Sequence, residues 1–195
     1  MRYIKDEWDF VRTLPKKVTF RANLVSCDIV SLYSSIPTEL GMEALEYWIE
    51  RLCSKIPARF TKSFILELAK FVLENNYCTF DSEMFRQVIG TAMGTIFAPP
   101  YACLVIGYLE ETKLFPHLLP SRFSPEICEK IIEFFYRFMD DGTTLLPIEV
   151  DLEVFLSLLN SMHPAIKYTV DKPMIISADG LIVQILVFMI FISLM

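Results

Sequence analysis

Residues 135–146, FYRFMDDGTTLL, place two adjacent carboxylates between two apolar runs. A glycine follows Asp140 and Asp141 directly, and acidic residues with a glycine between apolar segments are typical of a tight β-hairpin turn. An Asp–Asp pair by itself usually marks a solvated turn. The apolar flanks predict more here, namely that both carboxylates lie at the apex of a hairpin of buried strands.

A third carboxylate lies in the segment NLVSCDIV, residues 23–30, whose apolar and β-branched residues predict a buried strand. A carboxylate buried in such a strand, as expected for Asp28, is costly unless it is paired or bound to a metal. We expect Asp28, Asp140 and Asp141 to meet at one edge of a sheet. Their charges would repel one another there, and divalent cations would relieve that repulsion.

Carboxylates grouped in this way suit phosphoryl chemistry. Two Mg²⁺ ions held about 4 Å apart by Asp side chains lower the pKa of an attacking hydroxyl and neutralise charge on a leaving pyrophosphate. The residue pattern therefore suggests nucleotidyl transfer, but a calcium site or a simple acidic turn would have the same composition.

Apolar periodicity predicts two helices after the first strand. The first begins at Pro37–Thr38, and the second is capped by Thr61, with an apolar face made of Phe64, Ile65, Leu68, Phe71 and Val72. Residues 77–80 and 84–88 predict a hairpin. The small residues of GTAMGTIFAPP, residues 90–100, then lead into an apolar helix.

The second half of the chain predicts further elements. Pro116, Pro120 and Pro125 indicate a surface loop, and residues 131–139 and 143–146 form the strands of the acidic hairpin. A helix over 150–161 and a strand over 166–170 follow. The order β-α-α-β-β-α-β-β-α-β predicts an α+β fold with an antiparallel sheet and helices on one face, related to the split βαβ.

One domain is expected over residues 1–180, because no linker-like stretch divides the chain, followed by an apolar C-terminal tail over residues 181–195. The tail, LIVQILVFMIFISLM, contains no charge. Its fifteen residues are short for a bilayer span, which needs about 20. A core strand or an aberrant tail is the favoured interpretation, and a membrane segment is the alternative.

The formal net charge is −6, opposite in sign to that of a self-sufficient nucleic-acid-binding protein. Residues 1–21 are the exception, with six Lys or Arg against three Asp or Glu. The five cysteines contain no C-x-x-C pair, so we expect neither a disulfide framework nor a zinc site. An intracellular location, in the nucleus or the cytoplasm, is expected, with a membrane as the alternative because of residues 181–195.

Three motifs, taken together, resemble the palm of reverse transcriptases, most closely that of Penelope-like retroelements. The first runs from Asp28 to Tyr33, DIVSLY, and continues SSIP. The second is IGTAMGTIFAPPYA, residues 89–102, and the third is FMDD, residues 138–141. The later segment LNSMHPAIKYT, residues 159–169, is also similar to the family. The resemblance covers about residues 3–172 and implies an RNA-directed DNA polymerase, a nucleotidyltransferase that extends a primer 3′-hydroxyl with deoxynucleotides.

The resemblance also implies roles for single residues. Asp28, Asp140 and Asp141 would be catalytic and, with the backbone carbonyl of Ile29, would bind two Mg²⁺ ions, for which Mn²⁺ is an alternative. The nucleotide-binding residues would be Ile29, Tyr33, Met93, Gly94 and Lys167.

Within that set, Tyr33 would stack under the incoming sugar and exclude a 2′-hydroxyl; the alternative is a packed core aromatic. Met93 and Gly94 would line the nascent base pair, unless their loop is only a helix-entry turn. Lys167 has the weakest basis, because a lysine on an amphipathic strand is usually a solvated surface residue.

The chain also departs from the family pattern. The fingers and thumb are expected to be largely missing, and with them most of the positive charge that grips nucleic acid. The partners implied are an RNA template, a DNA primer and dNTPs, with the missing regions supplied by a longer product. Two other hypotheses stay open: a catalytically inactive retroelement remnant, and a membrane-associated protein anchored by its tail.

Overall fold

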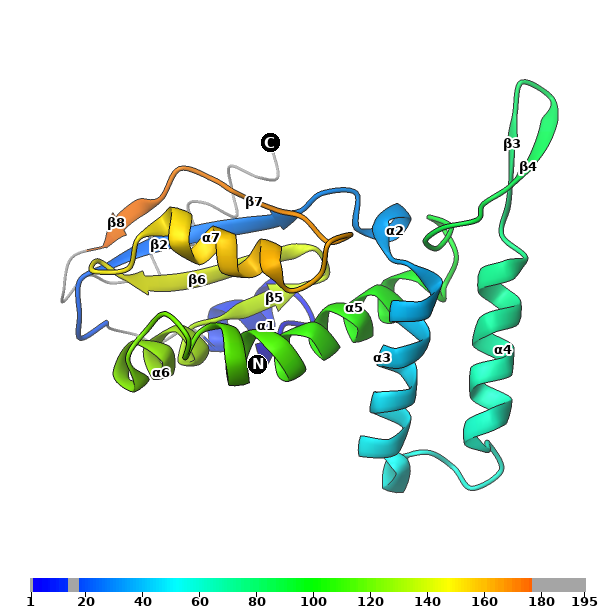
Figure 1. Cartoon of the computed structure of the whole chain (residues 1–195), viewed down its shortest axis with the longest axis horizontal. Helices are drawn as coiled ribbons and strands as arrows, with labels where there is room; N and C mark the ends of the chain where they lie inside the picture. The colour runs from blue at the N-terminus through cyan, green and yellow to red at the C-terminus, as the bar shows by residue number, and fades with distance from the viewer. Residues whose placement is uncertain (1, 14–17, 177–195) are drawn as a thin grey trace.

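The computed structural model describes residues 2–13 and 18–176 (Figure 1). The predicted domain boundary at residue 180 and the apolar segment 181–195 lie outside these residues. Within the described ranges, no helix is both long and apolar enough to cross a membrane.

The protein has an α+β fold, with helices and strands mixed along the chain. The helices are α1 (Glu7–Thr13), α2 (Leu32–Ser35), α3 (Thr38–Arg51), the 3-10 turn η1 (Cys53–Lys55), α4 (Lys62–Glu74), α5 (Ala98–Leu109), the π-helix η2 (Glu110–Leu118), α6 (Pro125–Glu133) and α7 (Leu152–Ser161). The strands are β1 (Arg2–Tyr3), β2 (Ala22–Ile29), β3 (Tyr77–Phe80), β4 (Glu83–Arg86), β5 (Tyr136–Phe138), β6 (Asp141–Pro147), β7 (Tyr168–Val170) and β8 (Met174–Ile176).

Strand β2 is central to the main sheet. The strand order is β1-β5-β6-β2-β7, and β8 pairs with the other end of β2. All the pairings of this sheet are antiparallel except that of β1 with β5. The predicted antiparallel sheet is therefore found, with one parallel strand added at its edge.

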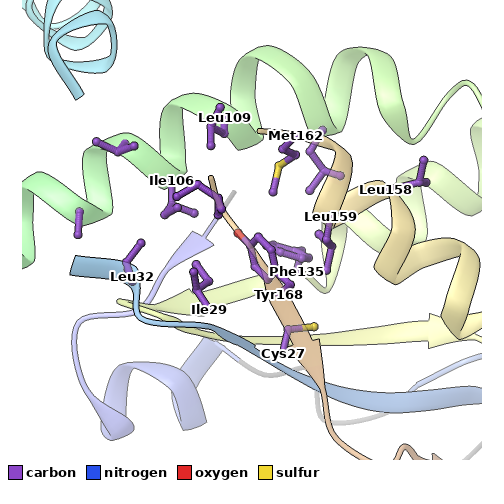
Figure 2. Close-up of a cluster of buried hydrophobic side chains, with 14 of the residues drawn as sticks. Cys27, Ile29, Leu32, Ile106, Leu109, Phe135, Leu158, Leu159, Met162 and Tyr168 are labelled. Carbon is purple, nitrogen blue, oxygen red and sulfur yellow. The ribbon is translucent and has the colours of Figure 1, made fainter. Parts of the chain in front are cut away.

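One face of this sheet is covered by α5 and α7. Cys27 and Ile29 of β2 join Ile106 and Leu109 of α5 and Leu159 of α7 in the larger buried cluster (Figure 2). Because side chains alternate along a strand, every second residue of β2 is directed into this cluster.

The opposite face carries a second, smaller buried cluster. It consists of Ile4, Val18, Ala22, Leu24, Phe134, Tyr136 and Leu145, with Phe10 of α1 packed against it. The rings of Phe10 and Tyr136 lie 5.7 Å apart, edge to face. The prediction that helices cover one face only was therefore wrong. Residues 2–13 were not assigned any element, and they supply β1 and the helix on the second face.

Two predicted boundaries also differ from the structure. Residues 131–133 end α6 instead of beginning a strand, so β5 is only three residues long. The proline-marked stretch after α5 is not all loop, because η2 includes Pro116 and Pro125 is the first residue of α6. A proline at the first helical position leaves unmade only a hydrogen bond that the helix lacks there in any case.

Helices α3 and α4 stand side by side at one end of the sheet, and the β3–β4 hairpin extends from them (Figure 1). The predicted cap of α4 is confirmed, since the Thr61 Oγ1 accepts a hydrogen bond from the Phe64 N–H at 3.2 Å. Its predicted apolar face is not buried, however: Phe64, Leu68 and Phe71 are 49–63% exposed. The buried residues of α4 are Ala69 and Leu73 instead.

Candidate active site

Asp28 lies near the end of β2, on the face of the sheet opposite α5 and α7. Its neighbours Cys27 and Ile29 are buried, whereas Asp28 is exposed. The expectation of a buried carboxylate was therefore wrong, because strand alternation turns this side chain toward solvent. A pairing partner or metal is thus not required merely to offset burial.

The acidic hairpin turn joins β5 to β6. Phe138 pairs with Asp141, which leaves Met139 and Asp140 as the two turn residues. The antiparallel β2–β6 ladder ends with the pairing of Cys27 and Gly142, so Asp28 and Asp141 are the next residues of the two strands beyond that last pair. The structure thus brings together acids that are far apart in the sequence.

The charges of these acids influence one another. Burial raises the pKa of Asp141 above its usual value, and the charges of Asp140, Asp28 and Asp171 raise it further. Asp171 is a fourth carboxylate, which the sequence analysis missed. Its N–H donates to the carbonyl of Ser26 at 3.0 Å, just beyond β7. Its place after the last predicted strand was the signal that could have found it.

The carboxylates at this site have the chemistry, but not the spacing, of ligands to a divalent metal ion. Carboxylate oxygens are the ligands that Mg²⁺ prefers, and a cation would offset the mutual repulsion felt at Asp141. As the side chains lie, however, the described residues contain no group of three or more His, Cys, Asp or Glu that could hold a metal ion. The chemistry of the donor set fits a hard cation, and a metal-bound arrangement would need the carboxylates to draw together.

Tyr33 of α2 reaches the same turn. Its hydroxyl donates to the Sδ of Met139 at 3.8 Å. Burial raises the pKa of Tyr33, and the charge of Asp140 adds to this effect. The Tyr33 side chain therefore lies beside the acidic turn.

The glycine-containing loop is joined to α2 through its backbone. The Gly90 N–H donates to the carbonyl of Ile36 at 3.0 Å, and the Thr91 N–H donates to that of Tyr33 at 2.7 Å. Gly90 has φ +79°, and a Cβ there would lie 2.6 Å from the Cα of Ser34. Sequence reasoning did not single out Gly90, although it stands in the quoted motif.

The other four predicted nucleotide-binding residues make no side-chain hydrogen bond to the acidic turn within the described part of the chain. Met93 is 71% exposed, and a Cβ on Gly94 would meet no atom within 4 Å, so both face open space. The Val30 N–H donates to the carbonyl of Lys167 at 2.9 Å, which places Lys167 beside the end of β2 with its side chain exposed. Ile29 pairs with Tyr168 in the β2–β7 ladder.

A small cavity lies next to Asp141, between the sheet and the segment that carries β1 and α1. It measures about 140 Å³. The sheet residues lining it include Tyr136, Phe138, Asp141 and Thr143, and Phe10 of α1 contributes from the other side. The surface beside the acids is thus aromatic and apolar.

The comparisons with known proteins agree with this geometry at the level of the fold. No protein-family model and no curated protein sequence matches the chain. Apo telomerase from Candida tropicalis, truncated from its C-terminal domain, superposes with a TM-score of 0.59 at 13% identity, covering 91% of this chain and 37% of that chain. Telomerase from Candida albicans in complex with a TWJ fragment of telomeric RNA gives 0.57 at 13%, covering 87% and 32%.

These likenesses show a reverse-transcriptase-like fold. The chain spans about a third of the length of the telomerases it resembles.

The raised pKa of Asp141, caused by partial burial and then by the neighbouring carboxylates, predicts a pH-dependent effect of Asp141→Asn. When folding raises the pKa of a carboxyl group, the folded protein loses stability as the pH rises from the usual pKa through the raised value. The variant is therefore expected to be more stable than wild type at neutral pH in metal-free buffer. The gain should be only a few tenths of a kcal/mol, because Asp141 is exposed and solvent screens its charge. Urea unfolding measures it.

The difference should vanish near pH 3, about where carboxyl groups are protonated in both states. Asp81→Asn is the matched control, since Asp81 lies in the β3–β4 turn with φ +49°, a conformation that asparagine also tolerates. A wild-type protein more stable than Asp141→Asn at neutral pH would contradict the prediction.

Proposed function

We propose that this chain is the palm region of an RNA-directed DNA polymerase, a reverse transcriptase most like those of Penelope-like retroelements. The observation that carries the proposal is the end of the β2–β6 ladder at the Cys27–Gly142 pair, next to which Asp28 and Asp141 stand on the two strands, with Asp140 in the adjoining turn. The reverse-transcriptase-like fold supports it. The reaction would be transfer of a dNTP to the 3′-hydroxyl of a DNA primer on an RNA template.

The metal ligands in this proposal are the carboxylates of Asp28, Asp140 and Asp141 and the backbone carbonyl of Ile29. Two Mg²⁺ ions, or Mn²⁺ in their place, would lower the pKa of the primer hydroxyl and offset charge on the pyrophosphate. The chain's own part is to keep the carboxylates at one sheet edge. The short antiparallel hairpin and the central β2 are well suited to this, because both are fixed by ladder hydrogen bonds.

Nucleic acid and nucleotide would lie beside the acidic turn, at the end of β2 where Asp28 is exposed. Met93, Gly94 and Lys167 would contact the nascent pair and the nucleotide from the loop and from the end of β2. The Candida albicans telomerase is described with an RNA fragment, which is consistent with nucleic-acid partners for this fold. In this proposal the protein acts in the nucleus or the cytoplasm. It would work together with fingers and thumb regions of a longer product.

The direct test is primer extension by the 195-residue chain with an RNA template, dNTPs and Mg²⁺. Slow, template-dependent extension is expected, and it should be lost with EDTA and in Asp140→Asn. The matched control is Glu149→Gln, an exposed acid at the other end of β6, which should extend like wild type. Absence of both extension and Mn²⁺ binding would contradict the proposal. Mn²⁺ binding without extension would favour the inactive remnant.

Tyr33 should set the choice of sugar. In a protein that extends primers, Tyr33→Ala is expected to increase incorporation of ribonucleotides relative to deoxynucleotides, because the ring that would meet the 2′-hydroxyl is gone. The ratio of kcat/KM for rNTP and dNTP measures this. Tyr33→Phe is the matched control, since it keeps the ring and removes only the hydroxyl that contacts Met139. Unchanged discrimination in Tyr33→Ala would reduce Tyr33 to a packing residue.

A further inference from the structure

The turn that carries Asp140 has an unusual backbone. Met139, the residue before Asp140, has φ +54°, in the left-handed region that few non-glycine residues adopt. Left-handed backbone costs about 1–2 kcal/mol for an L-residue. Contacts elsewhere must therefore hold Met139 in this conformation, and with it the direction in which Asp140 leaves the turn.

Arg137 supplies such a contact from inside the protein. It belongs to β5, and its side chain is only 1% exposed. Its Nη1 donates to the carbonyl of Met139 at 2.9 Å, and its Nη2 donates to the carbonyl of Cys103 in α5 at 3.2 Å. One guanidinium thus joins the acidic turn to the helix that follows the glycine-containing loop.

Glu110 fixes the guanidinium in turn. It lies where α5 passes into η2 and is 0% exposed. Its Oε1 accepts from the Nε of Arg137 at 2.8 Å, and its Oε2 accepts from Nη2 at 3.3 Å. The Glu110 carboxylate outweighs the effect of burial and raises the pKa of Arg137, so the guanidinium stays charged. A planar fork held at two points leaves Nη1 aimed in one direction.

We propose that Arg137, held by Glu110, is a positioning residue that fixes the Met139 carbonyl and so orients the Asp140 carboxylate, which would hold a divalent metal ion in the proposed function. This inference rests on the proposed function, because it assigns the pair a role at that site. Stability alone is a poor reason for the pair, since apolar residues of similar volume usually stabilise a core as well or better. The hydrogen bond from Nη1 to the Met139 carbonyl is what apolar residues could not make.

The test replaces the pair without leaving a buried charge. Glu110→Met with Arg137→Met removes both partners, and Arg137→Lys keeps the positive charge but not the planar fork. The matched control changes the same residue types at the surface pair of exposed Arg51 and half-buried Glu111, whose atoms lie 3.4 Å apart. The measurements are Mn²⁺ affinity from electron paramagnetic resonance, urea unfolding, and amide hydrogen exchange of residues 139–142.

The double variant is expected to unfold at the wild-type urea concentration or above but to bind Mn²⁺ about 10- to 100-fold more weakly, the usual effect of losing an outer partner of a metal ligand. The Mn²⁺ affinity of Arg137→Lys should lie between those of wild type and the double variant. The surface control should bind Mn²⁺ as wild type does. Wild-type Mn²⁺ affinity in the double variant would overturn the proposal. If the double variant does not fold, Arg137→Lys decides by the same measure.

A wild-type protein that binds no Mn²⁺ would count against the proposed function, and hydrogen exchange would then decide the positioning role separately. Faster exchange of residues 139–142 in the variants, with the β2–β6 ladder unchanged, supports a hold on the turn. Exchange equal to wild type in those residues overturns it.

Discussion

Replacing Gly41 by alanine is expected to lower the free energy of unfolding by about 3 kcal/mol, at the upper end of what overpacking a core costs. Gly41 lies in α3 where that helix packs against α5. A Cβ there would overlap the Oη and Cζ of Tyr101 and lie 2.8 Å from its Cε2. The Tyr101 side chain has little room to move, because it is 1% exposed and stacks on Phe97 at 5.1 Å. Urea unfolding followed by circular dichroism measures the loss.

Tyr101→Phe is the companion variant. The Tyr101 hydroxyl is buried and finds no hydrogen-bond partner among the described residues, so its removal alone should be neutral or stabilising. Combined with Gly41→Ala, it should recover part of the lost stability, since the closest overlap is then gone. If the changes in unfolding free energy of the two substitutions simply add in the double variant, the α3–α5 contact does not limit the size of residue 41.

Local patterns predicted much of the fold because local interactions decide those parts. The strand predicted over 23–30 is β2, shifted by one residue, and the Asp81–Ser82 turn joins β3 to β4 as expected. Both of these turn residues have positive φ, which the type I′ hairpin turn requires and which aspartate tolerates better than most residues. The helix begun by Thr38 and the cap at Thr61 were likewise confirmed.

Errors arose where distant parts of the chain decide the outcome. The periodicity of α4 shows that Phe64, Leu68 and Phe71 share a stripe, but it cannot show which face α3 covers. Asp28 stands among apolar residues, and only the pairing of β2 with β6 reveals that alternation turns it outward. The parallel pairing of β1 with β5 joins residues more than a hundred positions apart, and the two residues of β1 are too few to carry a strand pattern.

In the candidate site, too, the residues in local motifs could be predicted and those that act through long-range contacts could not. Asp28, Tyr33 and the Asp140–Asp141 pair belong to short motifs and could be selected from the sequence. Residues that place these groups could not, since their contacts are long-range: Arg137 and Glu110 are 27 positions apart, and a buried pair has no local signature. Gly90 was passed over because its need for glycine arises from the backbone of α2.

Gly90→Ala is expected to destabilise the protein by about 3 kcal/mol and to loosen Tyr33, because left-handed backbone costs about 1–2 kcal/mol and each lost hydrogen bond about 1. The new Cβ would overlap the carbonyl oxygen of Tyr33 and lie 2.6 Å from the Cα of Ser34. These are backbone atoms, so the loop must retreat and break its bonds to the carbonyls of Tyr33 and Ile36. Urea unfolding and hydrogen exchange of residues 32–36 measure both effects.

Gly94→Ala separates the two causes, because Gly94 also has a left-handed φ, +92°, but a Cβ there meets nothing within 4 Å. It should cost only the conformational part, about 1–2 kcal/mol, and leave exchange in α2 unchanged. Equal losses in the two variants would show that backbone strain alone acts at Gly90. A larger loss at Gly90, with faster exchange around Tyr33, would show that the glycine loop holds α2 against the acidic turn.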